Sequence, residues 1–372
     1  MVTASEVKDY GTKLGLDIVR IASAEPFPEY PKLVKDRLEK GLVPEEALAN
    51  EEVIRRADEF ADPQTSLRGA RSIVSLAMCI LIPGAKVDPE DPTPRGRIGR
   101  DNWRDFYGDI HTKRDMLAKF LQAKGARCSQ RPLLPLKRVA ARAGIGSYGM
   151  NCLISTERLG SWACLDAVVT DLDLEPDPPV EGGCGRCHAC IDACPTGALV
   201  APYTLDIGRC ITYLTASTLP IPRELRGRMG DRINSCDACQ EACPLNWDVS
   251  PATRGYTNPL ERWGERPPLA ALLEVGEREF QRSLAELNWY KPAPIYLHRN
   301  AIVAMGNVGN PVSVPPLGRA MRDSRPMIRA HAAWALGRIG GPGARKALAE
   351  AAKLEDDEVV EGEIEDAIED VK

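Results

Sequence analysis

The sequence predicts an α+β chain in three consecutive parts, and three observations carry that prediction. Apolar runs that suit strands alternate with helical patterns over the first half of the chain. Residues 184–243 then hold eight of the twelve cysteines. Beyond residue 299 a pattern of glycines and prolines recurs at an offset of 31 residues. We expect the parts at 1–175, 176–250 and 251–372, an ordinary division for a chain of 372 residues.

The first part has the pattern of an α/β domain. Val7, Tyr10 and Leu14 recur at helical spacing after Thr3 or Ser5, either of which can cap the helix. The run 70–82 is almost wholly apolar and is bounded by glycine and proline, as in a buried strand. The patterns predict helices at 3–15, 32–40, 45–60, 110–124 and 134–143, and strands at 16–22, 70–82, 152–155 and 162–170.

Residues 144–149 contain three glycines in the G-x-G-x-x-G pattern of dinucleotide-binding sites. Such a site needs a strand before the glycines and a helix after them. Here the predicted order is a helix, the glycines and then a strand, which disfavours a dinucleotide site. The absence of side chains at Gly144, Gly146 and Gly149 would instead let the backbone approach a large flat ligand closely.

The cysteine-rich part opens with the spacing C-x₂-C-x₂-C-x₃-C-P of bacterial ferredoxins. In that arrangement the fourth cysteine ligates the other cluster, so the spacing predicts a ferredoxin-like domain with two [4Fe–4S] clusters. Structural zinc does not need the x₃-C-P ending, and disulfides are disfavoured because no secretory signal is recognisable. The predicted ligands are Cys184, Cys187, Cys190 and Cys243 for cluster 1, and Cys194, Cys210, Cys236 and Cys239 for cluster 2.

The third part contains a repeat of the kind found in stacked helical hairpins. Gly306, Gly309 and Pro311 recur as Gly337, Gly340 and Pro342. We therefore expect HEAT-like repeats, with further helices at 269–273 and 277–287 before them. The acidic end of the chain, 355–370, is expected to be a solvated last helix or a frayed terminus.

Composition excludes some partners and favours one compartment. The formal net charge is −5 and the pI about 5.6, so no global positive field attracts nucleic acid, although a local basic patch stays open. No apolar run approaches the roughly 18 residues of a membrane span. Twelve cysteines with a cluster motif suit a reducing compartment, and we expect a cytoplasmic protein.

Six further segments occur in one order along the chain: 70–78, Ala143-Gly-Ile-Gly146, Gly160-Ser-Trp162, 203–215, 236–246 and the pair Arg299-Asn300 with Ala332-Ala-Trp334. Together they resemble the epoxyqueuosine reductase family over nearly the whole chain. The resemblance implies a cobalamin-binding reductase domain, a domain with two [4Fe–4S] clusters and a HEAT-like tail, related in its core to reductive dehalogenases. The family removes the epoxide oxygen of epoxyqueuosine in the tRNA anticodon loop, using electrons that pass through the clusters to base-off cobalamin.

The resemblance also implies site residues. The family carries its acid in an Asp-Tyr-His motif before a long helix, and we match that motif to Asp109, Ile110 and His111. Asp109 would protonate the departing oxygen, and a helix N-cap is the alternative for it. His111 would orient the acid or contact the corrin, unless it is a polar packing residue. The implied cobalamin contacts are His111, Gly144, Gly146, Tyr148, Gly149, Asn151, Ser161 and Trp162.

The implied partners are a tRNA anticodon stem-loop and an electron-donating flavodoxin or ferredoxin, with the chain itself a monomer. A local basic set supports RNA binding, unless its members are solvated outer faces of the repeats. The set is Arg319, Arg322, Arg325, Arg329, Arg338, Arg345 and Lys346.

The chain departs from the family pattern at several positions. Ile110, Leu136 and Met150 replace a tyrosine, an acidic residue and a lysine, and 288–298 lacks the usual basic run. An alternative function is therefore a paralogous cobalamin-dependent reductase, reductive dehalogenase-like, that acts on a small molecule. A third is a non-catalytic electron carrier that uses its helical repeats to bind a partner.

Overall fold

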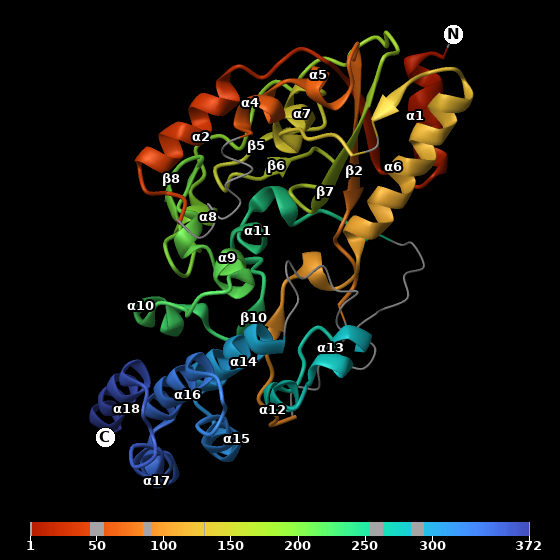
Figure 1. The fold of residues 1–372 in the computed structure, drawn as a ribbon. Coiled ribbons are helices and arrows are strands. Elements are labelled where there is room, and N and C mark those ends of the chain that lie inside the picture. The colour runs from red at the N-terminus through yellow and green to blue at the C-terminus, as the bar shows by residue number, and fades with distance from the viewer. Residues whose placement is uncertain are drawn as a thin grey trace. The chain divides into compact units, whose positions relative to one another are not determined.

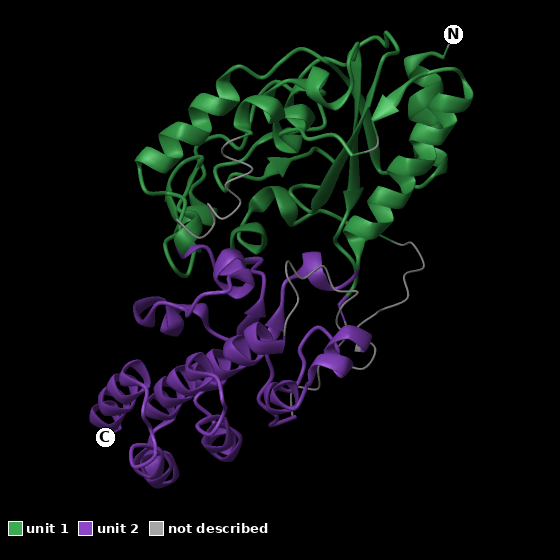
Figure 2. Cartoon of the chain, viewed as in Figure 1, with its two compact units in different colours: residues 1–83, 105–208, 238–254 green, residues 84–104, 209–237, 255–372 purple. Residues whose placement is uncertain are grey.

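The computed structural model describes residues 2–44, 56–84, 91–129, 131–252, 263–283 and 294–371. Helices and strands are mixed along the chain, which confirms the α+β prediction (Figure 1). The chain forms two compact units (Figure 2). Unit 1 comprises residues 1–83, 105–208 and 238–254, and unit 2 comprises 84–104, 209–237 and 255–372. The division at 1–175, 176–250 and 251–372 stays a prediction.

A four-stranded sheet forms the core of unit 1. Its strand order is β1 (Ile18–Ser23), β2 (Ser72–Cys79), β7 (Ala163–Thr170) and β4 (Cys128–Ser129). All three pairings are antiparallel, so the sheet differs from the parallel sheet of a doubly wound α/β domain. Every residue of β2 is buried, because β2 is paired on both edges and covered on both faces. This explains why its sequence is apolar except at Ser72 and Ser75, whose side chains are also buried.

Helices pack on both sides of this sheet (Figure 1). On one side lie α1 (Ala4–Lys13) and α6 (Phe106–Ala123), and on the other lies α7 (Leu136–Arg142). Thr3 and Glu6 form a capping box at the start of α1, as the sequence indicated. Among the described residues between β1 and β2 lie the helices α2 (Glu29–Glu39), α4 (Ala57–Ala61) and α5 (Pro63–Ser66). Most of the helix expected at 45–60 lies outside the described residues.

The glycine segment forms a hairpin that the sequence patterns did not predict. Strand β5 (Ser147–Tyr148) pairs with β6 (Ile154–Ser155) directly after α7. Cys152, in the connecting turn, has a φ of 64°, and its N–H donates to the carbonyl of Gly149. A helix before the glycines and a hairpin after them exclude the strand–turn–helix of a dinucleotide site.

The part of the chain that carries the clustered cysteines, 184–243, forms short helices and strands. Unit 1 contains α8 (Ala189–Asp192), the strand pair β8 (Leu199–Ala201) and β9 (Thr204–Leu205), and α11 (Ala238–Glu241). Unit 2 contains α9 (Ile211–Ala216), α10 (Arg223–Arg226) and β10 (Arg232–Asn234), which pairs in parallel with β3 (Arg97–Ile98).

Beyond residue 263, the described part of unit 2 is mainly helical. Its helices are α12 (Leu269–Leu273), α13 (Glu277–Ser283), α14 (Pro294–Val308), α15 (Val314–Ala320), α16 (Pro326–Ile339), α17 (Gly341–Ala351) and α18 (Glu358–Asp370). The recurring glycines have a packing role: a Cβ at Gly306 would lie 2.9 Å from the Cα of Ala335, and one at Gly337 would lie 2.9 Å from the Cβ of Ala367. Successive helices α14, α16 and α18 thus approach closely at the same point of each repeat.

For the acidic end of the chain, the expectation of a last helix is confirmed, and the alternative of a frayed terminus is wrong. Residues 358–370 form a complete helix whose Val360, Ile364 and Ala367 are buried. Apolar residues at helical spacing therefore anchor α18 in the repeat core, and the acidic side chains occupy its outer face.

Candidate functional site

The four cysteines predicted to bind cluster 1 lie together in unit 1. Cys184, Cys187, Cys190 and Cys243 line one cavity of about 100 Å³. Short elements bring them there: a loop carries the first two, α8 carries Cys190 and the end of α11 leads to Cys243. The rest of the lining is Gly149, Met150, Asn151, Ser155, Ser161, Pro244 and Leu245. Cysteines from the two ends of the cysteine-rich part thus meet around one small space, as the spacing rule requires.

The surroundings of these thiols suit an iron–sulfur cluster. The backbone N–H of Met150 donates to the sulfur of Cys184 at 3.2 Å, and such hydrogen bonds to sulfur tune cluster potentials. Burial and neighbouring thiols raise the pKa of Cys190, and burial first and then neighbouring thiols raise the pKa of Cys243. Within the described ranges, no three His, Cys, Asp or Glu side chains converge on a point suited to a single ion.

Hydrogen bonds among Ser161, Gln240 and Asn246, here called the Asn246 clasp, hold the segment next to Cys243 in place. The Ser161 N–H donates to Asn246 Oδ1 at 2.8 Å, and Asn246 Nδ2 donates to Ser161 Oγ at 2.9 Å. Gln240 Nε2 donates to the Ser161 carbonyl at 2.9 Å. Gly160 must lack a side chain, because a Cβ there would lie 2.0 Å from Asn246 Oδ1. The clasp ties the segment after Cys243 to the start of β7.

The cysteines predicted for cluster 2 are divided between the units. Cys194 and Cys239 belong to unit 1, where both border a small apolar cluster around Met150 and Cys190. Cys194 Sγ accepts a hydrogen bond from the Ala198 N–H at 3.2 Å. Cys210 and Cys236 belong to unit 2, at the N-terminus of α9 and after β10. Their pairing into one cluster stays a prediction.

The acidic residue at the start of α6 is Asp105, so the N-cap alternative for Asp109 is wrong. Asp105 Oδ1 accepts a hydrogen bond from the Gly108 N–H at 2.8 Å. Asp109 lies one turn inside the helix, where its carboxylate forms an ion pair with Lys113 at 3.0 Å. Lys113 Nζ also lies 3.2 Å from Met78 Sδ at the end of β2. The helix begins four residues earlier than its apolar pattern indicated, because an exposed capping residue leaves no periodic signal.

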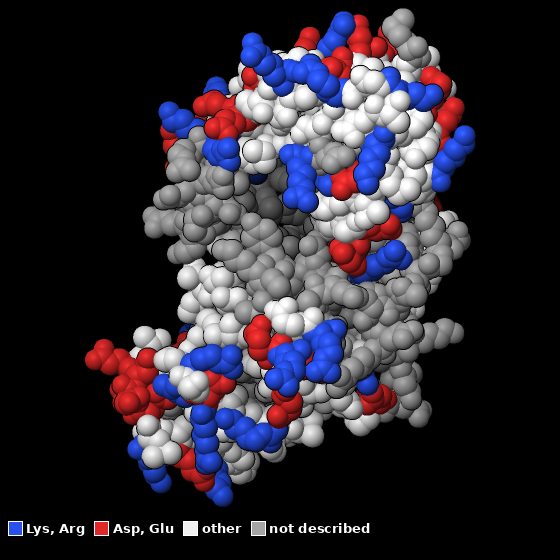
Figure 3. Space-filling model, turned by 45° about the vertical axis from the view of Figure 1, so that its right-hand side comes forward, with Lys and Arg blue, Asp and Glu red and all other residues white. Residues whose placement is uncertain are grey.

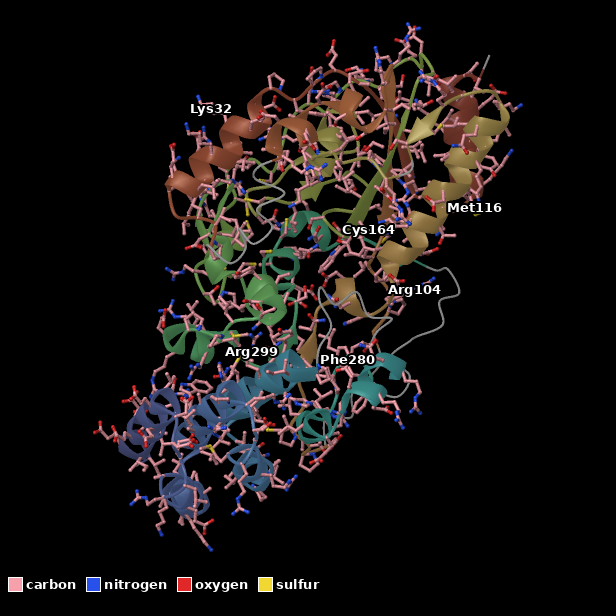
Figure 4. The ribbon with its side chains drawn as sticks, viewed as in Figure 1. Lys32, Arg104, Met116, Cys164, Phe280 and Arg299 are labelled. Carbon is pink, nitrogen blue, oxygen red and sulfur yellow. The ribbon has the colours of Figure 1, made fainter. Side chains whose placement is uncertain are left out.

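His111 faces a buried carboxylate on the sheet. Its Nε2 lies 3.7 Å from Asp166 Oδ2, which also accepts from Arg114 at 3.0 Å. Burial raises the pKa of Asp166, while Arg114 and His111 oppose that rise. Cys164, two residues earlier on β7, lies beside the start of α6 (Figure 4), with its sulfur 4.0 Å from the Phe106 carbonyl. The first turn of α6 therefore lies beside the first residues of β7.

The predicted cobalamin contacts fall into separate groups. Gly149, Asn151 and Ser161 line the cluster 1 cavity. Gly144 and Gly146 instead approach the chain itself, since a Cβ at either would lie about 2 Å from the carbonyl oxygen of Pro178 or Ser155. The ring of Tyr148 lines a second cavity, and Trp162 is buried beside β2. The fold thus explains these glycines without a ligand, and their contact with a corrin stays a prediction.

Sequence reasoning missed Gln240, Asn246 and the backbone of Met150 as parts of this site. Asn246 belongs to 236–246, one of the segments that carry the resemblance, and its place three residues after Cys243 was the available signal. Arg299 and Asn300, which belong to another segment that carries the resemblance, are buried in unit 2 (Figure 4 labels Arg299). Arg299 donates to the carbonyls of Leu214 and Ser217 and so caps the C-terminus of α9.

In the part of the chain that the structure describes, no helix is long and apolar enough to cross a membrane. A family model described as a 4Fe-4S double cluster binding domain matches residues 183–246, and one described as HEAT repeats matches 287–369. Both matches confirm the corresponding predictions: iron–sulfur clusters and HEAT repeats.

Full-length relatives share one description. Epoxyqueuosine reductase of Bacillus subtilis (strain 168) is 34% identical over 381 residues, which cover 99% of this chain and 95% of that protein. The Escherichia coli (strain K12) enzyme of the same name is 31% identical over 354 residues, 90% of this chain and 88% of that protein.

Two solved structures are similar over 99% of this chain and 98% of their own. One is the Bacillus subtilis enzyme with its aspartate-bearing catalytic loop swung out of the active site, at 33% identity and a TM-score of 0.91. The other is an epoxyqueuosine reductase with a tRNA-Tyr epoxyqueuosine-modified stem loop, at 31% identity and a TM-score of 0.88.

Proposed function

We propose that this chain, which belongs to the epoxyqueuosine reductase family, reduces epoxyqueuosine in tRNA to queuosine. It is accordingly an oxidoreductase rather than a non-catalytic carrier. The observation that carries the proposal is the similarity, over 99% of the chain, to an epoxyqueuosine reductase solved with its modified tRNA stem loop. Removal of an epoxide oxygen as water consumes two electrons and two protons, and the chain's residues have roles in supplying both.

The cysteines are proposed to supply the electron path. Cys184, Cys187, Cys190 and Cys243 would hold cluster 1, and Cys194, Cys210, Cys236 and Cys239 would hold cluster 2. The cavity formed by the first four, and the match over 183–246, support this assignment. The Asn246 clasp would keep Cys243 in place while the cluster changes charge.

Cobalamin is proposed as the cofactor that these electrons reach. When bound, it would supply the low-potential reductant for carbon–oxygen cleavage. Gly149, Asn151 and Ser161 would hold it next to cluster 1, which is supported by their place in the lining of the cluster cavity. That cavity is itself too small for a corrin. The corrin would therefore lie outside the cavity and contact these three residues at the rim of the cavity. His111, Gly144, Gly146 and Trp162 stay predicted contacts.

Asp109 is proposed to deliver the proton to the departing oxygen. Its place in the first turn of α6, at the position matched to the family's acid, supports the proposal, and the ion pair with Lys113 would orient its carboxylate. Asp105 is the second candidate, because it occupies the place directly before the long helix where the family motif lies.

Asp109→Asn and Asp105→Asn variants separate the two candidates. The true donor variant should keep its clusters and cobalamin, by absorbance, and lose at least about 100-fold in turnover of epoxyqueuosine tRNA. Asp115→Asn, on the exposed side of the same helix, is the matched control. Full activity of Asp109→Asn would remove Asp109 as the acid.

The remaining proposals concern the electron donor, the oligomeric state and the cellular compartment of the enzyme. A flavodoxin or ferredoxin would donate the electrons, and the chain would act as a monomer in the cytoplasm. Gel filtration at working concentration tests the monomer directly, and a dimer would contradict it.

A further inference from the structure

Unit 2 contains a buried polar network that the proposed reaction does not yet use. Its centre is the pair Arg299 and Asn300 in the second turn of α14, with exposed fractions of 0% and 1%. Burying a guanidinium is costly unless its donors are paired. Arg299 donates to the carbonyls of Leu214 and Ser217 at 2.8 and 2.9 Å, and to Asn300 Oδ1 at 2.9 Å. The arginine therefore holds the C-terminal end of α9 and also fixes the orientation of the Asn300 amide.

Asn300 joins two segments of unit 2. Its Nδ2 donates to the carbonyl of Thr215 in α9 and to the carbonyl of Ile233 in β10, each at 2.9 Å. Helix α14 contacts both elements, and the two elements contact each other (Figure 1). Because every polar atom of the Asn300 side chain has a partner, the amide fixes how α9 and β10 lie against one another.

Thr215 extends the network to the neighbours of two cysteines. Its hydroxyl donates to the carbonyl of Ile211 at 2.9 Å and accepts from the N–H of Ser235 at 3.0 Å. Ile211 directly follows Cys210, and Ser235 directly precedes Cys236. Ser235 has a φ of 57°, in the left-handed region that residues other than glycine rarely adopt, and such a conformation persists only where the surroundings hold it. The network thus ends one residue away from each of the two cysteines of unit 2 that are assigned to cluster 2.

We propose that Arg299, Asn300 and Thr215 are positioning residues for cluster 2. They would hold Cys210 and Cys236 at the separation that one [4Fe–4S] cluster bridges, and would keep that separation while the cluster changes charge. The inference rests on the proposed cluster ligands. It gives α14, which belongs to the segment matched as HEAT repeats, a part in electron transfer.

Two variants of Thr215 test the hydroxyl. Thr215→Val keeps the branched shape and leaves the Ser235 N–H without its acceptor, whereas Thr215→Ser keeps the hydroxyl. After reconstitution of the full chain, a chelator should remove cluster 2 from Thr215→Val at least about tenfold faster than from the native chain, measured by absorbance near 400 nm. Thr215→Ser should behave as the native chain does. A native rate in Thr215→Val, or equally fast loss in both variants, would overturn the inference.

Two asparagines of α14 provide a matched pair. Asn300→Asp keeps the shape of the side chain and its contact with Arg299, but loses both amide donors. We expect its iron content to fall from about eight to about four, and the dithionite-reduced protein to show about one unpaired spin in place of about two by electron paramagnetic resonance. Asn307→Asp is the control, because Asn307 donates to the carbonyls of Arg226 and Gly230 at 2.8 and 3.0 Å, and neither is next to a cysteine. Full iron in Asn300→Asp, or equal loss in both variants, would contradict the proposal.

A double variant shows which cluster depends on Asn300. Cys210→Ser removes a proposed ligand of cluster 2, so adding Asn300→Asp to it should cost little further iron, since both changes act on the same cluster. A fall to almost no iron in the double variant would mean that Asn300 supports the whole fold, and would overturn the inference. Unchanged iron in Asn300→Asp, with normal turnover of epoxyqueuosine tRNA by the native chain, would sink this inference alone. The expected iron losses without any native turnover would sink only the proposed function.

Discussion

Asn246 fixes the segment that follows Cys243, a proposed ligand of cluster 1. Its buried side chain makes hydrogen bonds to the Ser161 N–H, the Ser161 hydroxyl and the Gln240 carbonyl. In Asn246→Ala these groups lose their partner, at a cost of about 1–3 kcal/mol for each group left unsatisfied. We expect the variant to fold yet hold cluster 1 poorly.

Iron analysis measures this outcome. The native chain should bind about eight irons and Asn246→Ala closer to four, with a matching fall in absorbance near 400 nm. Asn310→Ala is the control, because Asn310 caps an exposed turn in unit 2. A full iron complement in Asn246→Ala would show that the clasp does not position Cys243.

His331 in α16 makes the stability of the repeats depend on pH. Its Nδ1 hydrogen-bonds to the Met327 carbonyl and its Nε2 accepts from the Ile221 N–H, so the ring is neutral. Burial first, and then the nearby Arg226 and Arg299, lower its pKa to about 3. The unfolded chain binds a proton near pH 6.5, so this contribution is complete above pH 6.5 and is lost as pH falls towards 3.

Denaturant unfolding at several pH values tests the role of His331. The native chain should lose on the order of 4 kcal/mol through this group between pH 6.5 and 3. His331→Gln should be less stable at neutral pH but should show a flatter pH dependence. Equal slopes for the two proteins would contradict the assignment.

At the scale of elements, α18 is tied to α10 by charge as well as by apolar packing. Arg226, with a side chain only 5% exposed, pairs with Glu363 at 2.8 Å, and Arg223 pairs with Glu363, Asp366 and Asp370. Glu363→Ala would leave the Arg226 guanidinium buried without its carboxylate, which costs about 3 kcal/mol. Thermal unfolding should show this loss, while Glu365→Ala, on the exposed face of α18, should change little. Equal stability of the two variants would show that Arg226 finds another partner.

Elements with a strong local signal could be predicted from the sequence, and those fixed by tertiary contacts could not. The apolar run of β2, the cap of α1 by Thr3 and the recurring glycines of the repeats each have a local physical cause, and each was predicted, Thr3 as one of two possible caps. The β5–β6 hairpin was missed, because its strands have two residues each and its turn depends on the left-handed conformation of Cys152. The start of α6 was misplaced because Asp105 is exposed and aperiodic.

The residues of the candidate site also divide into those that the sequence predicts and those that only tertiary contacts bring together. Thiol spacing is a property of the sequence, so the four cysteines of cluster 1 could be grouped from their spacing alone. The contact of Ser161 with Asn246 joins residues 85 positions apart, and no local pattern encodes it. The side chains of Tyr30 and Tyr148 meet across one cavity for the same reason.

At the scale of the whole molecule, ion pairs between the basic set and nearby carboxylates affect how strongly the enzyme could bind RNA. Five of the seven residues in the basic set pair with carboxylates: Arg319 with Glu274, Arg322 and Lys346 with Glu350, Arg325 with Asp323, and Arg329 with Glu355. Figure 3 likewise shows acidic and basic side chains intermixed on the face it presents. A phosphate would have to compete with these carboxylates, so we expect binding of the tRNA stem-loop to weaken only moderately with salt.

Glu350→Gln tests this competition, because Glu350 holds two cations of the set, Arg322 at 4.0 Å and Lys346 at 3.9 Å. Removing its charge should free both for phosphate, tighten stem-loop binding a few-fold and steepen the salt dependence, since each added phosphate contact raises the slope by roughly one unit. Fluorescence anisotropy of a labelled epoxyqueuosine stem-loop across a range of KCl concentrations measures both quantities. Glu369→Gln, which removes one exposed charge from α18, controls for the change in net charge. If both variants bind as the native chain does, this surface is not the RNA interface. If the native chain binds no stem-loop at any salt concentration, a small molecule becomes the better candidate for the substrate of this reductase.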